Sequence, residues 1–109
     1  MNVSNVVVLE EASDDLDLGR RFYEEREVGV GKYFVGLVLA DLESLLLYAG
    51  IHSVQFGFHR MLVRRFPFAV YYEIAEDTIR VVAVLDMRRD PNSIRAILSR
   101  RKGQRGTQQ

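Results

Sequence analysis

The chain has 109 residues with 15 Lys or Arg and 15 Asp or Glu, so its formal net charge is zero. This length suits one domain with its own core, and a hydrophobic content of 48% excludes a disordered chain. The lack of cysteine excludes disulfides and thiolate metal sites; no stretch predicts a signal peptide or a membrane span, so we expect a cytoplasmic protein.

Residues 3–9 are mostly β-branched and apolar, which predicts a buried strand. An amphipathic helix follows, because apolar residues recur at helical spacing opposite a charged face. It begins near Ser13, or two residues earlier, and ends near Glu27. The stripe that faces the core contains Ala12, Leu16, Gly19 and Tyr23, with Phe22 beside it.

A second helix is predicted between the glycines at 29–31 and the Ala49-Gly50 stop. This helix is unusually apolar, since four residues lie off its main stripe: Val35, Leu39, Leu46 and Leu47. Either both of its faces are buried, or the surplus apolar face meets another chain. A homodimer through this helix is therefore one expected assembly.

The second half of the chain predicts a loop over residues 51–57 and then three strands over residues 58–65, 68–75 and 78–86. Glu76-Asp77 forms a two-residue hairpin turn between the last two strands. Strict alternation places four residues of the last strand on one face: Ile79, Val81, Ala83 and Leu85. A short helix over residues 93–100 completes the pattern.

The order β-α-α-β-β-β(-α) predicts an α+β fold, with a helical hairpin on one face of a mostly antiparallel four-stranded sheet. We expect one domain over residues 1–98, a basic polar tail over residues 99–109, and an opposite sheet face that is free to bind a partner. The residues expected between hairpin and sheet are Phe34, Leu37, Leu42, Leu45, Val70, Tyr72, Val81 and Ala83.

The neutral total conceals an acidic half and a basic half. Residues 1–50 carry 4 Lys/Arg and 10 Asp/Glu, which gives −6, whereas residues 51–109 carry 11 and 5, which gives +6. The basic half indicates an anionic partner, unless the two halves neutralise each other in the folded chain. Arginine beside tyrosine on adjacent strands suits phosphate or carboxylate. The candidate binding residues are Arg60, Arg64, Arg65, Tyr71, Arg88 and Arg89.

Several segments together resemble the RelE/ParE toxin superfamily, particularly its ParE-like branch. The resemblance covers about residues 6–91. It is most specific in two segments. Residues 60–72 form a strand pair with a Phe66-Pro67 corner, and residues 82–91 end in Arg88-Arg89-Asp90-Pro91. The resemblance implies the toxin of a type II toxin–antitoxin pair of the plasmid-stabilisation kind. Its partner would be an antitoxin from an adjacent gene that wraps its C-terminal segment over the toxin.

The departures from the family pattern bear on the mechanism. Family members typically have histidine where this chain has Asp86, and RelE-type ribonucleases use a late acid/base that Pro91-Asn92-Ser93-Ile94 does not offer. RNA cleavage needs a proton acceptor and a donor, and the remaining candidate, His59, is more typical of a strand-edge histidine. The resemblance therefore favours DNA gyrase inhibition by binding. The alternatives are a RelE-like ribosome-dependent mRNA endonuclease and an inactive toxin-fold binding module. The sequence predicts no cofactor and no metal site, since two histidines without cysteine do not make a zinc site.

Overall fold

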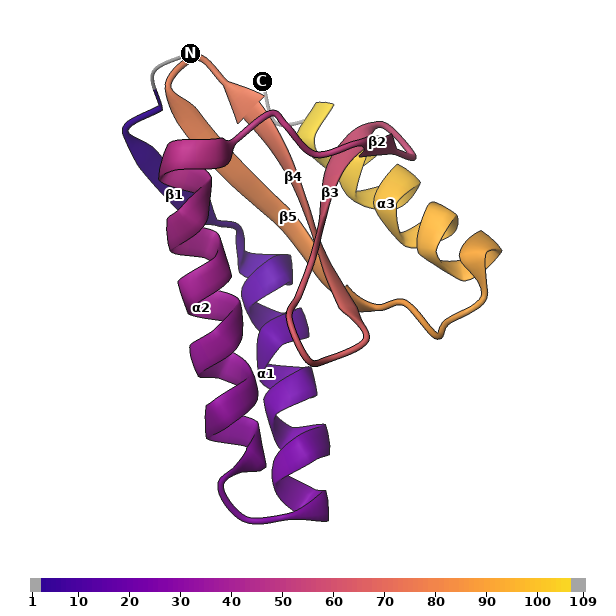
Figure 1. The fold of residues 1–109 in the computed structure, drawn as a ribbon. Helices are drawn as coiled ribbons and strands as arrows, with labels where there is room; N and C mark the ends of the chain where they lie inside the picture. Colours follow the sequence, from indigo (N-terminus) through magenta and orange to yellow (C-terminus); the bar gives the residue numbers. More distant parts are fainter. Residues whose placement is uncertain (1–2, 107–109) are drawn as a thin grey trace.

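The computed structural model describes residues 3–106 of the chain, and the side chains of residues 3–102. Its elements form a sheet with helices on both faces (Figure 1). In chain order they are β1 (Asn5–Val8), α1 (Glu10–Arg26), α2 (Val30–Tyr48), β2 (Val54–Gln55), β3 (Phe58–Leu62), β4 (Phe68–Ala75), β5 (Thr78–Asp86) and α3 (Pro91–Gly106).

The sheet has five strands in the order β1-β5-β4-β3-β2, and β1 pairs with β5 in parallel. The α+β class is as expected, but the predicted number of four strands is wrong. The additional strand, β2, lies in the segment expected to be a loop. It pairs with β3 through a two-residue turn in which Phe56 and Gly57 both have positive φ, of 55° and 87°. Both positive values match a type I′ hairpin turn, which normally favours Asn-Gly, so the sequence signal was absent.

Helices α1 and α2 form the expected hairpin, and its corner is held by one glutamate. Glu24 accepts hydrogen bonds from the backbone N–H groups of Gly29 (2.9 Å) and Gly31 (3.0 Å). These bonds lower the pKa of Glu24 and satisfy donors at the start of α2, where Gly29 has no side chain to cap them. A side chain at position 31 would collide with the backbone oxygen of Arg20, so the two helices can approach closely only at glycine.

The hairpin covers one face of the sheet and builds the larger core. Phe34, Leu42, Leu45, Val70, Tyr72 and Val81 are buried there, as predicted. Leu37 is only partly buried. The prediction for Ala83 is wrong: it is buried, but it belongs to the cluster on the opposite face.

A β-bulge explains the error at Ala83. Tyr72 pairs with Val81 and Tyr71 pairs with Ala83, so Val82 is an extra residue in β5. An inserted residue reverses the alternation beyond it. Consequently Val84, rather than Ala83 or Leu85, faces the hairpin after Val82.

The second face of the sheet is covered in part by α3, which passes beside β2 and β3 (Figure 1). Its Ile94 and Leu98 pack with Phe58, Ala69, Tyr71, Val82, Ala83 and Leu85. This face was expected to be free, and the helix was expected to end at Arg100. Instead α3 continues to Gly106 and includes most of the segment assigned to the tail, while residues 107–109 lie outside the described part.

Within residues 3–106, no helix has both the length and the apolar character needed to cross a membrane.

Candidate functional site

A groove lies beside the end of β5, where the sheet has a free edge. The parallel partner β1 ends its pairing at Val8, opposite Val81, whereas β5 continues to Asp86. In the described part of the chain, no strand pairs with residues 82–86 on that side. The unpaired N–H and C=O groups of an exposed strand edge can pair with another chain unless they are covered. The side chains along this edge therefore determine what can bind there.

The first part of the edge is closed by an ion pair between α1 and α3. Asp15 accepts a hydrogen bond from the backbone N–H of Val84 (3.0 Å). Arg101 donates from Nη1 to Asp15 (2.6 Å) and to the backbone oxygen of Val82 (2.9 Å), and from Nη2 to Asp15 (2.9 Å). The side chains of Arg101 and Asp15 are 12% and 10% exposed. This pair therefore provides hydrogen-bond partners for the Val84 N–H and the Val82 carbonyl oxygen at the sheet edge, and it connects α3 to α1.

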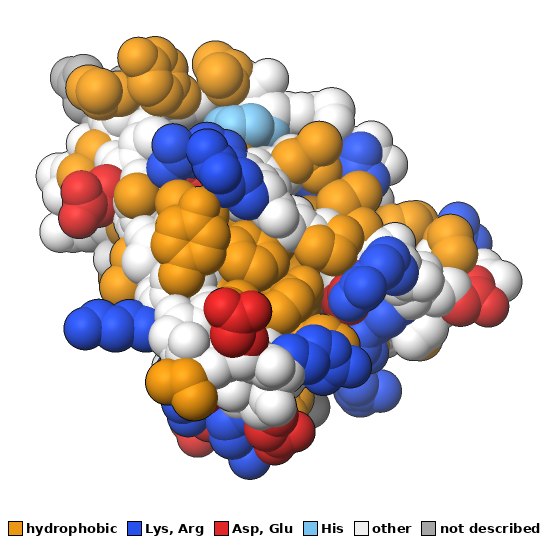
Figure 2. Space-filling view, turned by 60° about the horizontal axis from the view of Figure 1, so that its bottom comes forward, with side chains coloured by type: hydrophobic (Ala, Val, Ile, Leu, Met, Phe, Trp, Pro, Cys, Tyr) orange, Lys and Arg blue, Asp and Glu red, His pale blue; other side chains and the backbone are white. Residues whose placement is uncertain are grey.

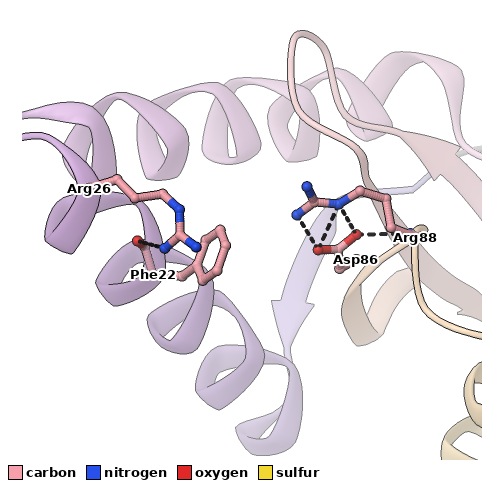
Figure 3. Close-up of polar contacts among 4 residues, drawn as sticks. All are labelled: Phe22, Arg26, Asp86 and Arg88. Atoms are coloured by element: carbon pink, nitrogen blue, oxygen red, sulfur yellow. Dashed lines mark hydrogen bonds and ion pairs between the residues drawn. The ribbon is translucent and has the colours of Figure 1, made fainter.

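Beyond the pair, the edge opens into an apolar groove of about 290 Å³. Its lining residues are Asp15, Leu18, Gly19, Phe22, Phe68, Val84, Leu85, Asp86 and Arg89. Leu18 and Phe22, both on α1, are 55% and 37% exposed. Arg26 lies 3.5 Å above the Phe22 ring and donates to the Phe22 carbonyl oxygen (3.1 Å), which fixes one end of the groove (Figure 3). An exposed apolar surface of this kind is typical of a protein-binding site.

The other rim of the groove carries Asp86 and Arg88 (Figure 3). The Arg88 guanidinium donates from Nη2 (2.6 Å) and Nε (3.0 and 3.2 Å) to Asp86, and the Arg88 backbone N–H donates at 2.8 Å. The hydrogen bond from the Arg88 side chain is the largest cause of the lowered pKa of Asp86, and burial opposes it in part. A carboxylate held ionised and fully bonded is a poor proton acceptor, so this rim is suited to recognition rather than acid/base chemistry.

The expected cationic site is divided among three places. Arg89 lines the groove, and Arg88 lies at its rim, where it pairs with Asp86. Arg64 donates from Nε to Asp41 of α2 (2.8 Å), while Arg65, at φ 67°, is exposed in the β3–β4 turn. Figure 2 likewise shows the Lys and Arg side chains of one face in separate groups, with apolar and acidic side chains among them.

Arg60 and Tyr71 are neighbours, as the adjacent strands predicted, but they lie on the α3 side. Tyr71 is only 1% exposed because α3 covers it. Burial raises the pKa of its phenol, and the nearby Arg60 guanidinium offsets this only in part. Tyr71 is thus a core residue in this conformation, not a surface contact.

Sequence reasoning did not identify the groove itself. Leu18 stands among charged residues of the first helix, outside the apolar stripe, and an isolated leucine there was the available signal. The roles of Asp15 and Arg101 gave no local signal, because they lie 86 positions apart in the chain and meet only through the fold.

A second polar cluster joins the end of α2 to β3 and β4. The Tyr72 hydroxyl accepts from the Gly50 backbone N–H (3.0 Å) and contacts His52 Nδ1 (2.5 Å), while His59 stacks on the Tyr72 ring at 5.0 Å. Burial is the main reason that the pKa of His52 is lowered, with the charge of His59 second. A neutral His52 whose Nδ1 accepts a hydrogen bond from the Tyr72 hydroxyl fits these contacts. Within residues 3–106, no group of three His, Cys, Asp or Glu side chains is placed to hold a metal ion.

Comparisons with known proteins give a structural match. No family model matches the sequence. No curated protein matches it either. Among solved structures, a chain of the "Chromosomal ParDE TA system from P. aeruginosa", a toxin–antitoxin system, superimposes with a TM-score of 0.67 at 18% identity. The match covers 76% of this chain and 94% of that chain. The protein therefore has a fold found in a ParDE toxin–antitoxin system.

Proposed function

We propose that the protein is the toxin of a type II toxin–antitoxin pair of the ParE kind. The observation that carries this proposal is the combination of a ParDE-type fold with an open apolar groove at the β5 edge. A toxin of this class has to be held inactive by a second protein, and the groove offers that protein apolar walls together with charged rims. The antitoxin would come from the adjacent gene.

The proposed mode of action is binding, with DNA gyrase as the target. Neither carboxylate among the described residues that line the groove is free for proton transfer, since Asp15 is paired with Arg101 and Asp86 with Arg88, which lowers the pKa of Asp86. This argues against the RelE-like endonuclease, which needs such a group. Gyrase-dependent DNA breaks without RNA cleavage, measured with the purified chain, would support the proposal. Cleavage of ribosome-bound mRNA would replace it with the nuclease.

The groove assignment is tested by a pair of exposed leucines. Leu18→Glu places a carboxylate in the groove beside Asp86, whereas Leu62→Glu changes a β3 leucine that is exposed to a similar extent, 57% against 55%, and lies outside the groove. We expect the first variant to bind the adjacent gene's product at least tenfold more weakly by calorimetry, because an unpaired charge is disfavoured in an apolar interface. The Leu62 variant is expected to bind as the parent does. Equal affinities for both variants would move the antitoxin to another surface.

Helix α2 offers a second contact surface. Leu39, Leu46 and Leu47 are 47%, 45% and 80% exposed, while Val35 packs in part against the core. Three exposed leucines on one helix are unusual for an isolated chain. We propose that they are covered by a second copy of the chain or by the antitoxin. The two cases differ in whether the purified chain alone dimerises.

A further inference from the structure

A second surface forms where α3 passes the β2–β3 turn. Residues 44–72 and 91–109 contain neither Asp nor Glu. The first of these segments includes β2 and β3, and the second includes α3, so the fold brings two acid-free segments together. Glu73 of β4 faces the α3 side of the sheet, but its carboxylate Oε2 already lies 3.7 Å from the Arg80 Nε. The carboxylates of α1 that reach α3, those of Glu11 and Asp15, pair with Arg101. Around the β2–β3 turn the surface therefore carries more cations than acids.

Two cations of α3 flank the turn directly. The Arg95 guanidinium lies 5.3 Å from the centre of the Phe56 ring. The Lys102 ammonium lies so near Gly57 that a side chain there would come within 3.2 Å of it. Both cations are exposed, and no ion pair is found for either among residues 3–102. Arg60 of β3 is a third cation on the α3 side of the sheet, beside Tyr71, and its buried Nε has no hydrogen-bond partner in this part of the chain.

The turn that these cations flank is strained. Phe56 adopts a φ of 55°, a left-handed conformation that bulky residues rarely take. Its ring packs against the α3-side core, which holds the turn against the helix. Backbone strain that is maintained by packing is common where a surface must be kept in shape for a ligand.

The composition of this surface decides the kind of partner. A protein partner or a membrane would need apolar anchors, but none of the exposed large apolar residues lies on α3 over residues 91–102. Arg95 and Lys102 are seven residues apart and share a flank of the helix. Seven residues correspond to about 10.5 Å along an α-helix, which is far enough for the two cations to contact different phosphates of one strand. From these features we infer that this α3 surface binds the phosphodiester backbone of a nucleic acid.

Contacts of this kind carry no base specificity and depend steeply on salt. The inference goes beyond the proposed toxin function, because the surface is separate from the groove and involves neither the antitoxin nor gyrase. Binding of the full chain can be followed by fluorescence anisotropy over a salt series. The probes are a labelled random-sequence DNA duplex and a single-stranded RNA of equal length, with polyglutamate as the competing polyanion.

The informative variant is Arg95→Gln with Lys102→Gln. Its control, Arg21→Gln with Lys32→Gln, also removes two positive charges, but from exposed positions on the helical hairpin. We expect the first variant to bind about tenfold or more weakly at low salt. Its log–log salt slope should fall by about 1.8 on duplex DNA, or about 1.4 on single-stranded RNA, whereas the control should bind as the parent does. The probe that the parent chain binds more tightly shows whether the phosphodiester backbone belongs to duplex DNA or to single-stranded RNA.

Three outcomes would overturn the inference. The first is a parent chain that binds neither nucleic acid. The second is an equal loss of affinity in both double variants, which would indicate an unlocalised charge effect. The third is displacement of the probe by polyglutamate as effectively as by unlabelled nucleic acid, which would point to an acidic peptide instead. None of these outcomes bears on the groove, whose leucine variants are tested against the antitoxin.

Discussion

The Asp15–Arg101 pair gives the sharpest stability prediction, because it joins α1, the β5 edge and α3. Arg101→Ala leaves Asp15 nearly buried, with the Val84 N–H as its remaining donor. Removing one member of a buried pair typically costs about 3–5 kcal/mol. The retained backbone hydrogen bond places our expectation at the lower end, about 3 kcal/mol. That is a large share of the roughly 5–15 kcal/mol that stabilises a typical domain.

The assay is urea denaturation followed by circular dichroism, with extrapolation to zero denaturant. Arg100→Ala is the matched control, since Arg100 is the adjacent residue of α3 and its side chain is exposed. We expect it to change stability by less than about 0.5 kcal/mol. Combining Arg101→Gln with Asp15→Asn should cost less than the sum of the two single changes, because the two residues act as one unit. Equal midpoints for the Arg101 and Arg100 variants would refute the reasoning.

Three further predictions concern the core, the histidine cluster and helix α2. Val70→Ala should lower the free energy of unfolding by about 1–3 kcal/mol, because Val70 is fully buried under the hairpin; a melt unchanged within error would contradict that placement. The lowered pKa of His52 means that the unfolded chain takes up a proton first, so stability should fall as the pH drops below about 6.5, the ordinary value, toward the folded-state pKa. Denaturant melts should show this loss for the parent and less of it for His52→Gln, and an identical pH profile would exclude His52 as the cause. Light scattering at high concentration should show a dimer that Leu46→Glu dissociates; a monomeric parent would leave the α2 surface to the antitoxin.

The sequence allowed most of the architecture to be predicted, because the hydrophobic periods are clear. The two long helices and the strands β4 and β5 follow directly from such periods. The errors arise where a local pattern is insufficient. The bulge at Val82 reverses a face without changing composition, and α3 has no marked apolar stripe, so neither its full length nor its packing over Tyr71 was evident.

The candidate site was harder to predict for a related reason. Arginine positions in a sequence show charge but not pairing, and the fold engages Arg64 with Asp41 and Arg88 with Asp86. The groove depends on where β1 stops relative to β5, which is a property of the assembled sheet. Only Arg88 and Arg89 of the six predicted residues lie at the groove.

The most direct test of the central claim is a growth assay with two separately inducible genes. Expression of this chain alone should arrest growth, and co-expression of the adjacent gene's product should restore it. The same product should fail to rescue cells that express Leu18→Glu, provided that this variant remains toxic. Normal growth during strong expression of the soluble, folded chain alone would contradict the proposed toxin function.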